Sequence, residues 1–332
     1  MFALFDQHVG DIQDELQSGI QTLRLCATMP TKDKAVFLQR TLQGLGSYQV
    51  VLQYVPFAYH HKGLPFDLLR HLESTFNRQK IHWMCHEIWC GLSIESKFKE
   101  RVLGWLQMRL LAKHLRRAAS VATSNPDYQE RLHRLTGKTI EPLPLFGNIP
   151  FNRSERQMPS RGAQDRPINI VLFGRIATDF PAERALRAIN GALCNAKRSC
   201  VITSIGRIDR GESAWKNFTR HEFPCISFSR RGELPPEEID RAIQLADFGL
   251  STTPLEGIGK SGTSIAILER GVPIIGCLQR GGPIGVFPNL FPQNQILTID
   301  CVSANDFKEP SVFEPRSMLT EVANRQLAIL GL

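Results

Sequence analysis

Short apolar runs alternate with amphipathic stretches along the second half of the chain. Residues 168–173 (INIVLF) and 200–205 (CVITSI) have the composition of buried strands. Similar runs predict further strands at 226–228, 247–252, 272–277 and 296–300. Apolar strands separated by helices are typical of a parallel sheet that is covered on both faces.

The stretches between these strands have the spacing of helices. Over 181–196, apolar residues recur on one face, which predicts an amphipathic helix. The run 235–238 (PPEE) predicts the start of another, because proline fits the first turn and acids favour the positive end of a helix. A third helix is predicted over 260–270.

The first half shows the same alternation less regularly. Strands are predicted at 2–4, 23–26, 50–54, 81–85, 121–123 and 140–143, with helices notably at 64–76 and 97–119. The polar, proline-containing stretch 151–167 lacks periodicity and is predicted to be a linker. We therefore expect an α/β protein with a first domain over 1–150 and a second, Rossmann-like domain over 168–315. An amphipathic helix within 316–332 could cross back to the first domain.

Composition narrows the class of protein. The 332 residues are 42% hydrophobic, enough for two cores, yet no run of 18 apolar residues would span a membrane. No basic stretch followed by an apolar one marks the start as a secretory signal, so we expect a cytoplasmic protein. The eight cysteines form no CxxC pair, which favours reduced core thiols over a disulfide framework. The net charge of +8 indicates an anionic partner.

The segment 251–276 (STTPLEGIGKSGTSIAILERGVPIIG) carries the clearest chemistry. A strand ends, a glycine-rich loop follows, and a helix starts near Ser261. Free amides at that helix start, the charge of Lys260 and the hydroxyls of Ser261 and Thr263 would together hold a diphosphate. The spacing GxGKSG is not that of a Walker P-loop. The alternative is an ordinary helix cap beside a chance lysine.

The chain resembles the GT-B glycosyltransferases, specifically group 1 (family 4). The matching stretches are VLFGRI (171–176), SIGRID (204–209), the run 226–254, EGIG (256–259) and GVPII (271–275). The resemblance implies two Rossmann-like domains facing each other across a cleft. It also implies transfer of a sugar from a nucleotide sugar, with retention of the anomeric configuration.

Carried over to this sequence, the resemblance implies a donor site in the second domain. Its diphosphate would lie against Gly174, Arg175, Lys260, Ser261, Gly262 and Thr263. Its nucleoside would lie near Gly206, Arg207, Ser229 and Arg230. Glu256 would match the first glutamate of the E-x7-E motif and contact the sugar, but Ser264 stands where the second glutamate belongs, so the motif is degenerate. The chain also opens at what resembles the family's second strand, which implies a shortened N-terminus.

In the first domain, His86 and Glu87 follow the predicted strand 81–85, at the carboxyl end where open α/β sheets bind ligands. His86 could bind the acceptor or the sugar while Glu87 orients it; a buried structural pair is the alternative. His82, Cys85, His86 and Cys90 form an incomplete ligand set, so no metal is expected.

Basic residues gather in 98–119 (FKERVLGWLQMRLLAKHLRRAA), offset against apolar ones including Trp105. Such a helix could lie on an anionic bilayer, at the inner face of the membrane; the alternative is an ordinary helix with a solvated charged face. It lacks a recognised nucleic-acid-binding motif, so no nucleic acid is expected as a partner.

These observations predict a metal-independent glycosyltransferase that uses a nucleotide-diphosphate sugar as its donor and needs no cofactor. The acceptor stays open among glycans, lipid-linked molecules and small molecules. Two alternatives remain: a catalytically silent GT-B-like scaffold, and a sugar-nucleotide epimerase of the same architecture.

Overall fold

The computed structural model describes residues 1–17, 19–43, 48–76, 81–92, 96–151, 166–206, 212–279 and 281–332. These residues form two compact units. The first comprises Met1–Thr123, Asp127–Pro142 and Ile329–Leu332, and the second comprises Ser124–Pro126 and Leu143–Ala328.

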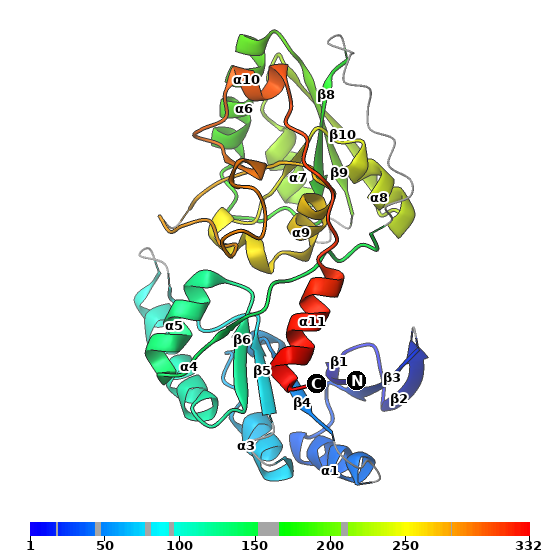
Figure 1. The fold of residues 1–332 in the computed structure, drawn as a ribbon, viewed down its shortest axis with the longest axis vertical. Coiled ribbons are helices and arrows are strands. Elements are labelled where there is room, and N and C mark those ends of the chain that lie inside the picture. The colour runs from blue at the N-terminus through cyan, green and yellow to red at the C-terminus, as the bar shows by residue number, and fades with distance from the viewer. Residues whose placement is uncertain are drawn as a thin grey trace. The chain divides into compact units, whose positions relative to one another are not determined.

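The second unit is built on a parallel six-stranded sheet in the order β10-β9-β8-β11-β12-β13. Figure 1 labels β8, β9 and β10 of this sheet. Its strands are β8 (Ile168–Phe173), β9 (Cys200–Ile205), β10 (Ile226–Gly232), β11 (Phe248–Leu250), β12 (Ile274–Gly276) and β13 (Ile296–Thr298). Its α-helices are α6 (Ala182–Ala196), α7 (Glu212–Thr219), α8 (Pro236–Gln244), α9 (Gly262–Glu269), α10 (Ala304–Lys308) and α11 (Leu319–Leu330). The last residues of α11, from Ile329, are assigned to the first unit. Two 3₁₀ helices span Leu255–Lys260 and Gln293–Gln295.

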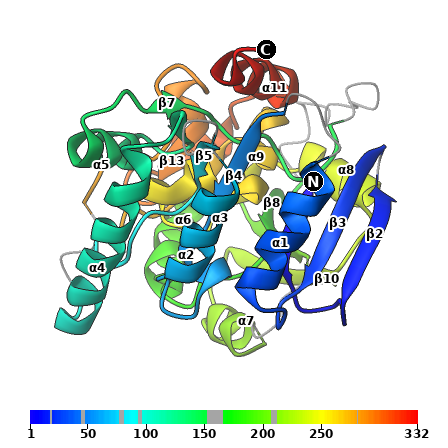
Figure 2. The same ribbon diagram turned by 90° about the horizontal axis from the view of Figure 1, so that it is seen from below.

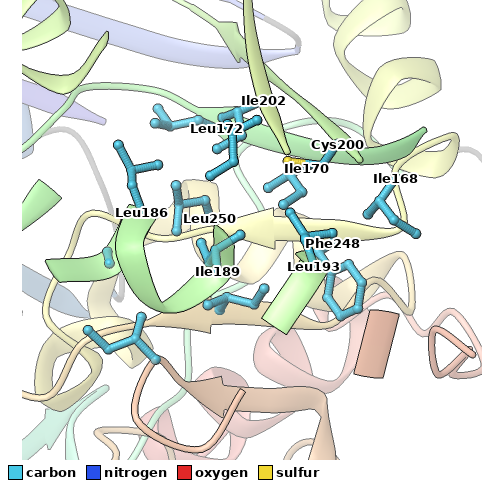
Figure 3. Close-up of a cluster of buried hydrophobic side chains, with 14 of the residues drawn as sticks. Ile168, Ile170, Leu172, Leu186, Ile189, Leu193, Cys200, Ile202, Phe248 and Leu250 are labelled. Atoms are coloured by element: carbon cyan, nitrogen blue, oxygen red, sulfur yellow. The ribbon is translucent and has the colours of Figure 1, made fainter. Parts of the chain in front are cut away.

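Alternation along β8 divides the core of this unit between the two faces of the sheet. Ile168, Ile170 and Leu172 face a cluster with α6, whereas Val171 contributes to a second cluster that includes residues of α8 and α9. Figure 3 shows the first cluster, where Leu186, Ile189 and Leu193 of α6 meet strand residues such as Ile202 and Phe248. Burying each such side chain stabilises the fold by roughly 2 kcal/mol.

The first unit holds two sheets. A parallel sheet in the order β4-β5-β6-β7 consists of β4 (Val50–Tyr54), β5 (Ile81–Cys85), β6 (Ser120–Thr123) and β7 (Glu141–Pro142). A three-stranded sheet in the order β1-β3-β2 consists of β1 (Phe2–Asp6), β2 (Ile12–Gln17) and β3 (Ile20–Cys26). The helices are α1 (Thr31–Leu42), α2 (Pro56–Tyr59), α3 (Phe66–Thr75), α4 (Phe98–Leu115) and α5 (Pro126–Thr136), and α1 packs beside α3 (Figure 2).

The predicted α/β fold with two Rossmann-like units is confirmed. Helices α7 and α10 were not among the predicted elements, and two further elements differ from the predictions. The antiparallel strand β2 was not predicted, because its sequence IQDELQ leaves even Leu16 75% exposed and so presents no buried apolar face. The helix predicted over 260–270 is shorter: Lys260 ends a 3₁₀ helix, Ser261 caps the next turn, and α9 begins at Gly262. The predicted linker falls almost wholly on 152–165, outside the described residues.

Candidate functional site

Three glycines mark the carboxyl edge of the sheet in the second unit. Phe173 pairs in register with Ile205, and Ile205 pairs with Gly232, so β8, β9 and β10 end at one level. Gly174 follows β8 with φ +93°, Gly206 follows β9 with φ +105°, and Gly232 ends β10 with φ +70°. These conformations suit glycine because it lacks a Cβ, so the chain turns away sharply at each strand end.

The turn after β8 lies against the start of α9, and the turn after β9 lies against the turn after β8. A Cβ placed on Gly174 would come within 3.1 Å of the Thr263 methyl carbon, and one on Gly206 within 3.4 Å of the Gly174 backbone. The structure therefore brings together three of the predicted donor residues: Gly174, Gly206 and Thr263. Arg207, predicted to lie beside them, falls outside the described residues.

Hydroxyl groups organise the N-terminus of α9. The Ser261 Oγ accepts a hydrogen bond from the Ser264 amide at 3.3 Å and lies 3.1 Å from the Thr263 Oγ1. Ser251, just after β11, lies 3.3 Å from the Ser264 hydroxyl. The helix geometry leaves the amides of Gly262 and Thr263 without intrahelical acceptors, and the first turn carries no acidic residue. This end of α9 therefore has the electrostatics of an anion site.

The hydroxyl group of Thr252 fixes the turn that contains Arg175. The Thr252 hydroxyl donates to the Arg175 carbonyl at 3.0 Å and accepts from the Ala177 amide at 3.2 Å. The Arg175 side chain itself is exposed. Its backbone is therefore held at the glycine-lined edge of the sheet.

Lys260 and Glu256 both lie in the 3₁₀ helix that leads into Ser261, and both are half-buried. The Glu256 carboxylate accepts the Gln279 amide at 2.9 Å. This hydrogen bond holds the stretch after β12 in place, so the Glu256 carboxylate, for which we predicted a contact with the sugar, also has a structural contact. The sugar contact of Glu256 stays a prediction.

Ser229 and Arg230 lie on β10, which is an edge strand of the sheet. Both side chains are exposed, and the Arg230 guanidinium pairs with Glu212 of α7 at 2.6 Å. A nucleoside contact by Arg230 would therefore require this pair to rearrange.

The other end of α9 holds a buried ionic network that the sequence did not indicate. Arg270, at the C-cap, bonds Asp240 of α8 at 2.5 Å and donates to the Pro150 carbonyl at 2.8 Å. Glu269 accepts the amides of Met318 and Gly147. Burial raises the pKa of Glu269, and these two amides oppose the rise. The N-terminus of α9 thus forms the candidate anion site. Its C-terminal end is bonded to two segments distant in sequence, one that contains Gly147 and Pro150 and one that contains Met318.

In the first unit, His86 and Glu87 follow β5 as predicted. The His86 Nε2 lies 2.6 Å from the Gln53 Oε1 of β4. Because that oxygen only accepts, Nε2 carries the proton and Nδ1 is the basic nitrogen of the ring. Burial lowers the pKa of His86, against the opposite effect of Glu87, so the ring is neutral at neutral pH. Gln53 was missed because nothing in the sequence pairs it with a residue so distant.

His82 takes no part in a metal cluster. Its Nδ1 lies 2.7 Å from the Ser120 hydroxyl and its Nε2 lies 3.1 Å from the Gln49 Oε1, so both nitrogens have polar partners. Across the described ranges, no group of three or more His, Cys, Asp or Glu residues is arranged to hold a metal ion.

Comparisons with solved structures define the class of fold. The chain is similar to the sucrose-phosphate synthase of Thermosynechococcus elongatus, with 15% identity, a TM-score of 0.53, and coverage of 100% of this chain and 81% of that one. It is also similar to a UDP-forming α,α-trehalose-phosphate synthase of Burkholderia vietnamiensis, with 9% identity, a TM-score of 0.55, and coverage of 99% of this chain and 86% of that one. A third similar structure, from E. coli, is described as trehalose-6-phosphate bound with UDP-2-fluoro glucose. It has 10% identity and a TM-score of 0.50, with coverage of 99% of this chain and 87% of that one.

The chain therefore has the GT-B fold that its sequence predicts. At the level of sequence, no protein-family model matches it and no curated protein compared with it is similar.

Proposed function

We propose that the chain is a glycosyltransferase that moves a sugar from a nucleotide-diphosphate sugar to an acceptor. The observation that carries this proposal is the capped N-terminus of α9, which lies against the glycine turn after β8, with the turn after β9 next to that turn. The structures similar to this chain support it, because their names include a UDP-forming synthase and a complex with UDP-2-fluoro glucose.

In this proposal the second unit binds the donor without a metal ion. The amides of Gly262 and Thr263, with Arg175 and Lys260, neutralise the diphosphate. These groups stabilise the negative charge that grows on the leaving diphosphate as the glycosidic bond breaks. Gly206, Arg207 and Ser229 would border the nucleoside, and the sugar would be transferred with its anomeric configuration retained.

The first unit would bind the acceptor. The neutral ring of His86 could accept a hydrogen bond at Nδ1 from a hydroxyl group, because Nε2 is engaged by Gln53. Glu87, next along the chain, favours the charged form of that ring and would stabilise it if it takes up a proton.

The test is calorimetric titration of the chain with UDP, GDP and ADP, comparing wild type with Lys260→Ala. Removing one ammonium group from a diphosphate site should weaken binding about tenfold or more. Lys308→Ala is the matched control. Lys308 is exposed and directly follows Phe307. The Phe307 carbonyl accepts a hydrogen bond from Arg198, which lies just before the amino end of β9, so Lys308 lies at the edge of the sheet opposite to the candidate donor site.

Nucleotide binding that is lost in Lys260→Ala and kept in Lys308→Ala supports the donor site. Absence of binding to any nucleotide contradicts it. A separate assay of sugar release from the donor distinguishes an enzyme from a silent scaffold. Conversion of the donor's sugar without an acceptor would instead indicate an epimerase.

We further propose that α4 contacts an anionic membrane. Four large apolar side chains are exposed on one face of this helix: Phe98 at 80%, Val102 at 43%, Trp105 at 48% and Leu106 at 39%. Leu110 and Leu111 are buried on the opposite face. The exposed face continues toward the C-terminus with basic residues, Arg109, Lys113, Arg116 and Arg117. Apolar insertion beside a basic stretch is how an interfacial helix binds a bilayer.

A further inference from the structure

Three cysteines of the second unit gather around the starts of β9 and β10. Cys194 lies in the last turn of α6, Cys200 begins β9, and Cys225 directly precedes β10. The Cys200 amide donates to the Cys225 carbonyl at 2.8 Å, which places these two residues side by side at the amino edge of the sheet. This edge is opposite to the candidate donor site.

Two of these cysteines lie on neighbouring segments. The Cys225 amide donates to the Asn190 Oδ1 at 3.1 Å, and Asn190 stands one helical turn before Cys194 on the same face of α6. The side chain of Cys225 is hydrogen-bonded to that of Cys194. A disulfide would join the two sulfur atoms at a bonded distance of about 2.05 Å.

The three thiols differ in access. Cys194 is exposed, Cys225 is half-buried, and Cys200 is 1% exposed. The hydrogen bond to Cys194, followed by burial, raises the pKa of Cys225 to about 11, and burial raises the pKa of Cys200 to about 12. An oxidant arriving from solvent therefore meets Cys194 first, and Cys225, whose side chain interacts with that of Cys194, is more accessible than Cys200.

We propose that Cys194 and Cys225 form a reversible disulfide by exchange with a low-molecular-weight disulfide such as oxidised glutathione. The Cys194 thiolate attacks one sulfur of glutathione disulfide and releases one glutathione thiolate, leaving a mixed disulfide on Cys194. Cys225 then loses its proton to solvent and attacks the Cys194 sulfur, releasing the second glutathione. The two cysteines are oxidised together, and one glutathione disulfide is reduced to two thiols.

This bond would join α6 to the entrance of β10 and close the intervening chain, which contains β9 and α7, into a loop. The proposal does not depend on the proposed sugar transfer, because neither cysteine belongs to the donor site. It adds a thiol modification site to a chain whose cysteines, by spacing alone, indicate only reduced core residues.

The experiment equilibrates the full chain in glutathione buffers of rising oxidised fraction, stops exchange with acid, and maps tryptic peptides without reduction. Cleavage puts each cysteine on its own peptide: 188–197 for Cys194, 199–207 for Cys200 and 221–230 for Cys225. We expect 188–197 cross-linked to 221–230, and loss of that cross-link when excess dithiothreitol is added.

Two variants assign the order of attack. In Cys225→Ser, glutathione should remain on peptide 188–197, because the resolving thiol is gone. In Cys194→Ser, peptide 221–230 should stay reduced in the same buffers. Cys301→Ser, which removes another exposed cysteine of this unit, is the matched control and should leave the cross-link unchanged. A cross-link from 188–197 to 199–207, or stable glutathione on Cys194 of the wild type, overturns the proposal.

Discussion

At the scale of single residues, the turn after β8 depends on a backbone conformation that glycine adopts without strain. Gly174 has φ +93°, and a Cβ there would press on Thr263, the residue whose amide we place at the donor diphosphate. We therefore predict that Gly174→Ala lowers the free energy of unfolding by about 1–2 kcal/mol and weakens nucleotide binding more than tenfold. Urea unfolding and calorimetric titration measure the two effects.

Gly191 supplies the control. It lies inside α6, is exposed, and has nothing within 4 Å of the position that a Cβ would take. Gly191→Ala should raise the free energy of unfolding by roughly 0.5–1 kcal/mol, because alanine favours the helix, and should leave nucleotide binding unchanged. Equal effects of the two substitutions on binding would contradict the role given to the turn after β8.

Part of the candidate site follows from local sequence, and part does not. The glycine turns and the Ser261 cap were predictable because strand ends, positive-φ glycines and helix starts leave signals within a few residues. The hydroxyls of Ser251 and Thr252 were missed, since their partners lie at Ser264 and Arg175. Contacts between residues distant in the chain depend on the order of strands in the sheet, which periodicity does not specify.

At the scale of elements, α9 is stabilised at its C-terminus by a buried ion pair. The side chains of Arg270 and Asp240 are 1% and 5% exposed, so removing one charge leaves the other buried and unpaired. We predict that Asp240→Asn lowers the free energy of unfolding of the second unit by about 3 kcal/mol. Urea unfolding followed by the fluorescence of Trp215, on α7 in that unit, measures the change.

Glu183→Gln is the matched control for this charge. Glu183 pairs with Arg187 one turn along α6, but the two side chains are 51% and 71% exposed, so water screens the pair. Its unfolding midpoint should equal that of the wild type within error. If Asp240→Asn behaves in the same way, the buried pair contributes nothing to the stability of α9.

The elements themselves show where sequence patterns succeed. Strands such as β5 were predicted because all their residues are buried and apolar runs mark them. The exposed strand β2 was missed because its sequence lacks that contrast. Helix α9 was predicted too long because Lys260 belongs to the preceding 3₁₀ helix, while Ser261 and Arg270 are the caps of α9.

At the scale of the whole molecule, a net charge of +8 and the exposed apolar face of α4 suggest a peripheral encounter with anionic lipid. No helix in the described part of the chain is long and apolar enough to cross a bilayer. We predict that the chain floats with vesicles containing phosphatidylserine and not with phosphatidylcholine alone. Phe98→Ser with Trp105→Ser should reduce the bound fraction at least about tenfold, because both side chains would lose their apolar burial in the lipid.

Phe66→Ser is the control for this flotation. Phe66 begins α3 of the same unit and is 54% exposed, so the substitution removes a comparable aromatic surface away from α4. Vesicle binding should be unaffected. Failure of the wild type to float with anionic vesicles at low salt would exclude α4 as a membrane contact.

The network at the end of α9 bears on how this protein can be dissected. Composition suggests cutting the chain within the polar stretch 151–167 to obtain the second unit alone. Such a fragment would lack the Pro150 carbonyl that accepts from Arg270 and the Gly147 amide that donates to Glu269, so each of these two buried side chains would lose a hydrogen-bond partner. A fragment that starts before Leu143 and continues past Met318 retains both of these hydrogen-bond partners. We expect such a fragment, although shorter than the full chain, to be purified in folded form.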